Sequence, residues 1–132
     1  MLEIAKYKGI IEEGQLVRVS GKVIEVIGLI VEVVGLTASI GEICEIMVSE
    51  NQKTVAEVVG FRQGRTLVMP LGSLDGVAPG AEVIGTGRSH QIKVGSGILG
   101  EVLDGLGRPL HDPNRSWTGN WIPVSNFPPN PL

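Results

Sequence analysis

The sequence is poor in cysteine and in aromatic residues, and it contains no long hydrophobic run. The one cysteine among 132 residues, Cys44, excludes an internal disulfide and any zinc site built from several cysteines. The longest largely apolar stretch, residues 26–31, is far shorter than the roughly 20 residues that a membrane-spanning helix needs. The first six residues show neither the basic start nor the apolar run of a signal peptide. We therefore expect a soluble, cytoplasmic protein.

Because aromatic side chains are scarce, the core must be built from aliphatic ones. Only 4% of the residues are aromatic, and the many β-branched residues favour strands. The scarcity also argues against single-stranded nucleic acid, which binds by stacking its bases on aromatic rings in a basic groove. The predicted strand region offers only Phe61 as such a platform, and the net charge of the chain is -3. We expect no nucleic-acid partner.

The loop that holds nucleotide phosphates is also missing. The pattern G-x-x-x-x-G-K-[ST] does not occur, and the one Gly-Lys pair, Gly21-Lys22, has no glycine five residues earlier. Three glutamates, Glu25, Glu32 and Glu57, alternate with apolar residues, which is typical of solvated strand faces rather than of a general acid and base. We predict no catalytic, cofactor-binding or metal-binding residue in this chain.

The thiol and the two imidazoles are predicted to have no chemical role. Cys44, flanked by Ile43 and Glu45, is typical of a small buried strand residue, and a catalytic thiol would need a histidine nearby. His90 and His111 lie in turn-like segments, which predicts that they are surface residues.

Residues 95–100, GSGILG, match the dinucleotide-binding pattern G-x-G-x-x-G. In that motif a full strand precedes the glycines, and an acidic residue about 20 positions later binds the ribose. Here the preceding strand is very short, and residues 116–120 contain no acid. The tail that follows is too rich in proline to complete a β-α-β unit. These glycines are therefore predicted to form a turn.

Short runs of strand-forming residues fill most of the chain up to residue 84. Each ends at glycine, asparagine or proline turn residues, and the runs cover residues 16–27, 29–34, 41–48, 54–61, 66–71 and 81–84. The 19 glycines suit the bends and bulges of a small barrel. Six runs at this spacing predict an all-β sandwich or barrel, and barrel closure would remove the edges that such apolar strands expose.

The sequence changes in character after Gly87. Residues 92–94 are predicted to form one more short strand, and apolar residues at 98, 99, 102 and 103 have the spacing of a helix. From Pro109 to Leu132 there are six prolines and no apolar period, so this stretch should not form regular structure by itself. We expect a connector that is partly disordered over residues 110–132, with rapid amide exchange there.

One segment is specific enough to indicate a family. Residues 97–110, GILGEVLDGLGRPL, resemble the passage that joins the barrel to the nucleotide domain in the rotary ATP synthase α/β and type III secretion ATPase superfamily. Residues 21–32, 55–61 with 67–72, and the closing 128–132, PPNPL, are similar to the export branch of that superfamily. The resemblance covers nearly the whole chain, and it is slightly closer to the flagellar export ATPase than to the injectisome ATPase.

The resemblance implies a closed six-stranded barrel over residues 16–88 that helps to assemble a hexameric ring. The short helix and the proline-rich connector predicted above would follow this barrel. Residues 89–132 would lead into an ATP-binding domain, and residues 1–15 would dock a stator-like regulatory partner. In the family, ATP and Mg²⁺ serve a protein-export enzyme that works with chaperones and an export gate at the inner membrane. Because this chain stops before the phosphate loop, we expect it to be inactive and to self-associate weakly.

Two other functions are consistent with these features. A stand-alone, non-catalytic barrel could act as an assembly adaptor, which would require a natural stop after Leu132. The N-terminal domain of an ion-pumping ATP synthase subunit would have the same fold. Association of the full protein with a rotor stalk and a membrane ion channel would favour that function.

Overall fold

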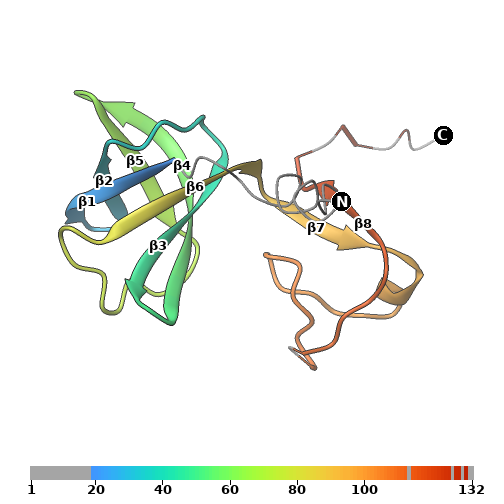
Figure 1. Cartoon of the computed structure of the whole chain (residues 1–132). Coiled ribbons are helices and arrows are strands. Elements are labelled where there is room, and N and C mark those ends of the chain that lie inside the picture. The colour runs from blue at the N-terminus through green and yellow to red at the C-terminus, as the bar shows by residue number, and fades with distance from the viewer. Residues whose placement is uncertain (1–18, 113, 126, 129, 131–132) are drawn as a thin grey trace, which may run out of the picture. The chain divides into compact units, whose positions relative to one another are not determined.

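The computed structural model describes residues 19–112, 114–125, 127–128 and 130 (Figure 1). Its regular secondary structure is almost entirely strand, which confirms the all-β prediction. The chain divides into two compact units, with the boundary between Gly87 and Arg88. The predicted docking segment, residues 1–15, lies outside the described residues.

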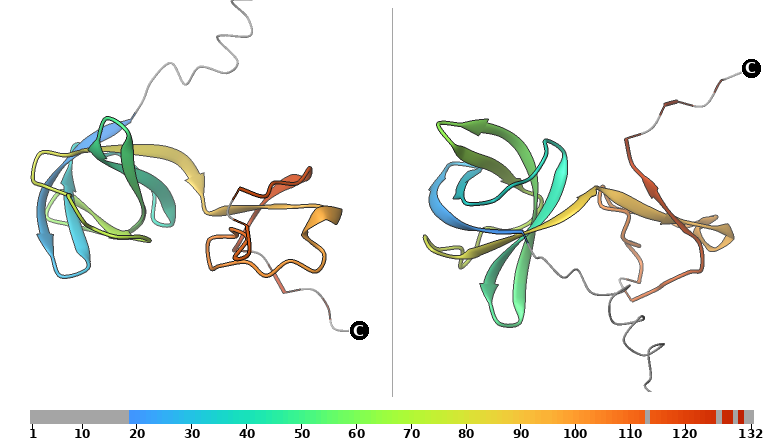
Figure 2. Two further views of the ribbon diagram at one scale, coloured as in Figure 1. Left: turned by 90° about the horizontal axis from the view of Figure 1, so that it is seen from below. Right: turned by 45° about the horizontal axis from the view of Figure 1, so that its top comes forward.

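Six antiparallel strands close into a barrel in the order β1-β2-β5-β4-β3-β6, which confirms the predicted fold. The strands are β1 (Ser20–Ile27), β2 (Ile30–Val34), β3 (Glu42–Ser49), β4 (Gln52–Arg62), β5 (Arg65–Pro70) and β6 (Glu82–Ser89). Figure 2 shows the ribbon curling round on itself, so that the last strand, β6, lies beside the first and completes the wall.

The core of the barrel is aliphatic, as the composition predicts. Strand alternation turns every second residue inward, so that Val31 and Val33 of β2 and Val58 of β4 are fully buried. One cluster of side chains, each at most 6% exposed, comprises Val23, Val31, Val33, Leu36, Cys44, Ile46, Ala56, Val58, Val68 and Val83. None of the aromatic residues that the structure describes belongs to this cluster.

Three strands of the barrel contain a β-bulge, which helps a small barrel to bend sharply enough to close. The extra, unpaired residue is Ile24 in β1, Val48 in β3 and Val59 in β4. A bulge re-aims the side chain of its extra residue. Ile24 and Val59 are accordingly 40% and 38% exposed, although both belong to apolar strands.

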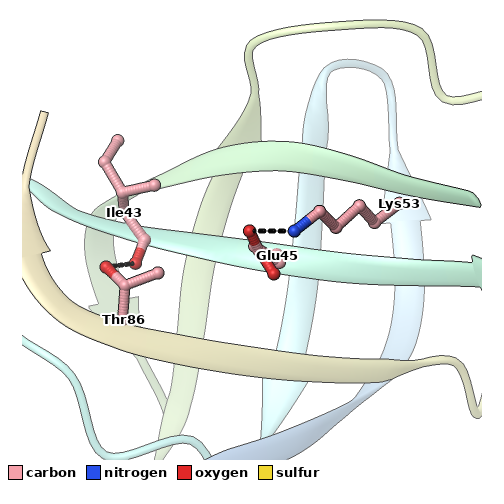
Figure 3. A network of polar contacts seen from close by, with 4 residues as sticks. All are labelled: Ile43, Glu45, Lys53 and Thr86. Atoms are coloured by element: carbon pink, nitrogen blue, oxygen red, sulfur yellow. Dashed lines mark hydrogen bonds and ion pairs between the residues drawn. The ribbon is translucent and has the colours of Figure 1, made fainter. Parts of the chain in front are cut away.

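Polar contacts tie β3 to the strands on both of its sides (Figure 3). Thr86 Oγ1 of β6 donates to the carbonyl oxygen of Ile43 in β3 at 2.6 Å, where the barrel closes. On the other side, Lys53 Nζ of β4 lies 2.6 Å from Glu45 Oε1 of β3. Because both partners of this ion pair are partly exposed, we expect it to contribute less than about 1 kcal/mol to stability.

The second unit contains a two-stranded antiparallel sheet of β7 (Gln91–Val94) and β8 (Asn120–Pro123). The sequence predicts β7, but β8 lies in the proline-rich connector that we expected to be irregular. That prediction is wrong for these residues, because β7 supplies the hydrogen-bonding partner that the connector lacks by itself. Pro123 is tolerated because it stands at the end of the strand.

The short helix of the second unit is a single 3-10 turn, Ser96–Ile98. The helical spacing of residues 98–103 does not produce a longer helix. Gly100 has a positive φ of 79°, a conformation outside the helical range, and it turns the chain away at that point.

Candidate functional site

Within the described residues, no group of three or more His, Cys, Asp or Glu side chains is arranged to hold a metal ion. The same part of the chain contains no helix that is long and apolar enough to cross a membrane. These findings do not test the prediction that the chain has no catalytic, cofactor-binding or metal-binding residue, which stays a prediction. Three other features bear on function: a glycine cluster, an aspartate-capped turn and the outer wall of the barrel.

The glycines of residues 95–100 pack against the segment that precedes β8. A Cβ at Gly95 would lie 2.2 Å from the carbonyl oxygen of Thr118, and one at Gly97 would lie 2.6 Å from the Cβ of Trp117. These glycines therefore let two stretches of backbone approach closely. The helix that follows has only three residues, too few to form the helix N-terminus that holds a pyrophosphate. The cluster forms a turn, as predicted.

A tight hairpin-like turn in the second unit is held together by Asp104. Its Oδ1 atom accepts hydrogen bonds from the amides of Leu106 and Arg108, each at 2.8 Å. The Asp104 backbone donates to the carbonyl oxygen of Arg108 at 2.9 Å and accepts from the amide of Gly107 at 3.0 Å. Gly107 has a φ of 79° and lies against Ile92 of β7, where a Cβ would come within 2.4 Å of Ile92 Cγ2. Residues 104–109, DGLGRP, belong to the segment that resembles the ATPase superfamily. They thus form a turn that packs on β7.

These contacts predict how the turn responds to pH. The hydrogen bond from the Arg108 amide, together with that from Leu106 and the charges of Arg108 and His90, lowers the pKa of Asp104 from its ordinary value of 3.8, although desolvation opposes this. Because the pKa is lower in the folded state, the ionised carboxylate stabilises the turn above the unfolded value. That stabilisation is lost as the pH falls through the folded value. We expect an NMR titration midpoint for Asp104 below 3.8, with the amide shifts of Leu106 and Arg108 following it.

An Asp104→Asn variant supplies the control for this prediction. It should remove the titration and speed amide exchange at Leu106 and Arg108, because a neutral amide oxygen is a weaker acceptor than a carboxylate. The amide of Ile98, which donates to Gly95 in the neighbouring turn, should exchange as before. A midpoint at or above 3.8 in the parent protein would contradict the prediction.

Cys44 is a buried residue of β3, as predicted. Its thiol lies 3.6 Å from the carbonyl oxygen of Ala56, toward which it donates. Burial, with a smaller effect of Glu42 and Glu45, raises the pKa of the thiol to about 12. Since thiolate is the reactive form, this cysteine should be inert in the folded barrel.

The two histidines differ from each other. His111 is exposed, as predicted. His90 is only partly exposed, and its Nε2 atom is buried with no hydrogen-bond partner among the described residues, so the prediction of a surface residue is wrong. Its carbonyl oxygen accepts from the amide of Val124 at 3.0 Å, just beyond β8, and this bond holds the residue inside the second unit.

Among the three glutamates of the strands, Glu25 is exposed and Glu57 is partly exposed. Glu32 is only 7% exposed, so the prediction of a solvated face is wrong for this residue. Its Oε2 atom lies 2.5 Å from Arg65 Nη1. Glu32 pairs with Leu67 across the β2–β5 ladder, two residues from Arg65, so the long arginine side chain can cover the carboxylate.

The outer wall of the barrel exposes several large apolar side chains. They are between 37% and 74% exposed and comprise Ile24, Ile27, Leu29, Val59 and Met69. Exposed apolar side chains that gather in one patch mark sites of protein–protein contact. Sequence reasoning missed these residues, although residues 26–31 contain more apolar side chains than the inward positions of two strands can hold.

The described residues thus form a small closed barrel with apolar side chains on its outside, and a second unit with a two-stranded sheet. Residues 16–87 match the model of the β-barrel domain of the ATP synthase alpha/beta family. This match covers more than half of the chain, and the protein belongs to that family.

Individual relatives come from both branches that the sequence resembles. A type 3 secretion system ATPase of Pseudomonas savastanoi is 44% identical over 94 residues, covering 71% of this chain and 21% of the relative. A flagellum-specific ATP synthase of Pseudomonas aeruginosa is 36% identical over 125 residues, covering 92% of this chain and 26% of the relative. Another from Bacillus subtilis is 40% identical over 97 residues, covering 72% and 22%. The chain thus spans about a fifth to a quarter of the length of these relatives.

Proposed function

We propose that this chain is the N-terminal barrel and linker of an ATP-driven protein-export enzyme, and that the barrel helps to assemble a hexameric ring. The observation that carries the proposal is the family match of residues 16–87 together with relatives named as ATPases of type 3 secretion systems and flagella. Because the chain spans only part of their length, we assign ATP hydrolysis to the remainder of the protein. ATP and Mg²⁺ would bind there rather than to residues of this chain.

The surface of the second unit supports the idea that more protein packs against it. A two-stranded sheet alone is only marginally stable in water. Large apolar side chains of this unit are exposed, including Leu99, Leu110, Trp121, Ile122, Val124 and Phe127. Such a surface suits a linker that leads into a further domain, which in this proposal is the nucleotide-binding domain.

The proposal also assigns the partners. Further copies of the protein are the neighbours in the ring, and residues 1–15 meet a stator-like regulatory subunit. The complete enzyme works in the cytoplasm, peripheral to the export apparatus at the inner membrane, where it meets export chaperones and the gate.

The test is the intact mass of the native protein combined with ATP hydrolysis by that protein and by the 132-residue chain. We expect a native product several times longer that contains G-x-x-x-x-G-K-[ST] and hydrolyses ATP, whereas the 132-residue chain does not. Changing the motif lysine to alanine is the control and should abolish hydrolysis. A native product that ends at Leu132 would contradict the proposal and favour an assembly adaptor. Association with a rotor stalk and an ion channel would favour an ion-pumping subunit.

A further inference from the structure

Strands β1 and β4 lie on opposite sides of the barrel. In the closed order β1-β2-β5-β4-β3-β6, each is the third neighbour of the other in both directions, which is the largest separation that six strands allow (Figure 1). A contact made through β1 therefore leaves β4 available for a second contact that faces the opposite way.

The outside of β1 and of the turn after it combines apolar side chains with an acid. This surface, the β1 wall, comprises Ile24, Glu25, Ile27 and Leu29. The three apolar members are 40%, 53% and 74% exposed, and Ile24 is the residue that the bulge re-aims. Glu25 is exposed and makes no hydrogen bond or ion pair among the described residues.

The charge of Glu25 is not balanced by its neighbours on the barrel. Glu25 lies directly opposite Glu32, a like charge, and the nearby Arg65 is already paired with Glu32. The other base of β1, Lys22, lies opposite Glu82 of β6. The β1 wall therefore presents an acid for which residues 19–89, the described part of the barrel, show no partner.

The outside of β4 is similar in composition but opposite in charge. This surface, the β4 wall, comprises Val59, Gly60 and Arg62. Val59 is again a bulge residue and is 38% exposed. Phe61 pairs with the buried Thr66 and so lies on the other face of the strand. Gly60 has no side chain, and a Cβ added there would meet nothing within 4 Å, so the wall is open at this point.

Arg62 is the counterpart of Glu25. It is exposed, lies directly opposite Arg65 across the β4–β5 ladder, and makes no ion pair within the described residues. Arg65 is again the residue that is occupied by Glu32. Two other charges lie on the outside of the same strand: Glu57, five positions away, is only partly exposed, and Lys53, nine positions away, is paired with Glu45.

We propose that the β1 wall of one copy docks on the β4 wall of the next, with Glu25 against Arg62 and the apolar members of the two walls in contact. The inference rests on the proposed ring function and names the surfaces that make it. Two different patches on opposite sides generate a head-to-tail contact, which closes into a ring or continues as a filament. The opposite charges select the wall that meets each partner and prevent either wall from pairing with itself.

Each wall is small, so the contact made by this chain alone is weak. Stable interfaces bury about 800 Å² on each partner, which is more than four side chains provide. The remainder of the proposed full-length protein would add the missing area. Self-association of the 132-residue chain should therefore be examined by cross-linking, which traps transient complexes, rather than by measuring its mass in solution.

The experiment cross-links an Ile27→Cys chain to a Val59→Cys chain with a short bis-maleimide reagent. We expect the mixture to give cross-linked heterodimers, and the double variant to give a ladder of larger species. Either single variant alone should give little product, because like walls do not pair. The parent chain is the control, since its Cys44 is buried and has a pKa of about 12. Equal yields from like and unlike walls, or no product from any pairing, would overturn the proposal.

Charge reversal then tests the named pair. Glu25→Arg in the Ile27→Cys chain, or Arg62→Glu in the Val59→Cys chain, should each lower the heterodimer yield about tenfold. The two reversals together should restore the yield, which simple unfolding would not do. Glu50→Arg, on the exposed turn after β3, is the matched control and should change nothing. Cross-linking yields that do not depend on the sign of these charges would overturn the pairing of Glu25 with Arg62.

The same two reversals in the full-length protein separate this inference from the proposed function. We expect each single variant to lose ring assembly and an equimolar mixture of the two to regain it, because opposite walls match again around an alternating ring. If full-length rings form equally well in both single variants, the walls are wrong while the ring function stands. If the full-length parent hydrolyses no ATP and forms no ring, the proposed function itself fails.

Discussion

Replacing Gly21 with alanine is expected to remove about 3 kcal/mol from the stability of the barrel. For a domain of this size, such a loss lowers the melting temperature by about 15 °C. A Cβ at Gly21 would lie 2.6 Å from the carbonyl oxygen of Val34 and 2.7 Å from the amide nitrogen of Leu36. Both are backbone atoms, which cannot rotate away as the end of a side chain can. The segment after β2 would have to move, and Leu36, which it carries into the core, would move with it.

Gly60→Ala is the matched control within the same barrel. It changes a strand glycine in the same way, but its added Cβ would meet no atom within 4 Å. Its free energy of unfolding should stay within about 0.5 kcal/mol of that of the parent, so its melting temperature should hardly change. Thermal unfolding followed by circular dichroism compares the two variants. Equal melting temperatures would show that the segment after β2 moves at little cost in free energy, and they would contradict the expectation.

The barrel is predictable from the sequence because the patterns that mark its strands and turns lie within short stretches of the chain. Period-two alternation and the glycine, asparagine and proline turns mark six strands, and nearly the same residues form β1 to β6. The aliphatic composition likewise predicts a core without aromatic rings. Closure follows from a physical argument about exposed edges rather than from any single residue.

Features that depend on distant partners are not predictable in this way. The burial of Glu32 requires Arg65, which is 33 residues away, and alternation alone places the glutamate on a solvated face. The strand β8 exists because β7 pairs with it, and its own four residues carry no periodic signal. In both cases the deciding interaction comes from another part of the chain.

The candidate docking surface could not be predicted from the sequence for a different reason. Ile24 and Val59 belong to strands whose apolar residues are counted as core when the sequence is interpreted. The bulges shift the register by one residue, so these two side chains face outward. A sequence shows that a strand is apolar, but the position of a bulge is set when neighbouring strands of unequal length are paired.

Gly119→Ala is expected to open the sheet of the second unit while leaving the barrel intact. A Cβ at Gly119 would lie 2.1 Å from the carbonyl oxygen of Val94 and 2.6 Å from its carbonyl carbon, at the point where β7 and β8 meet. A two-stranded sheet is only marginally stable, so this clash should be enough to open it. We expect the amides of β7 and β8 to exchange about 100-fold faster, which corresponds to a loss of about 3 kcal/mol.

Two natural probes report the two units separately in this experiment. Both tryptophans lie in the second unit, and Trp117 Nε1 donates to the carbonyl oxygen of Lys93 in β7 at 2.8 Å, so their fluorescence should change. Cys44 lies in the barrel core and should stay unreactive to thiol reagents. Gly105→Ala, whose added Cβ would meet nothing within 4 Å, is the control and should alter neither probe. If Gly119→Ala makes Cys44 reactive as well, the two units unfold together, and the barrel depends on the linker for its stability.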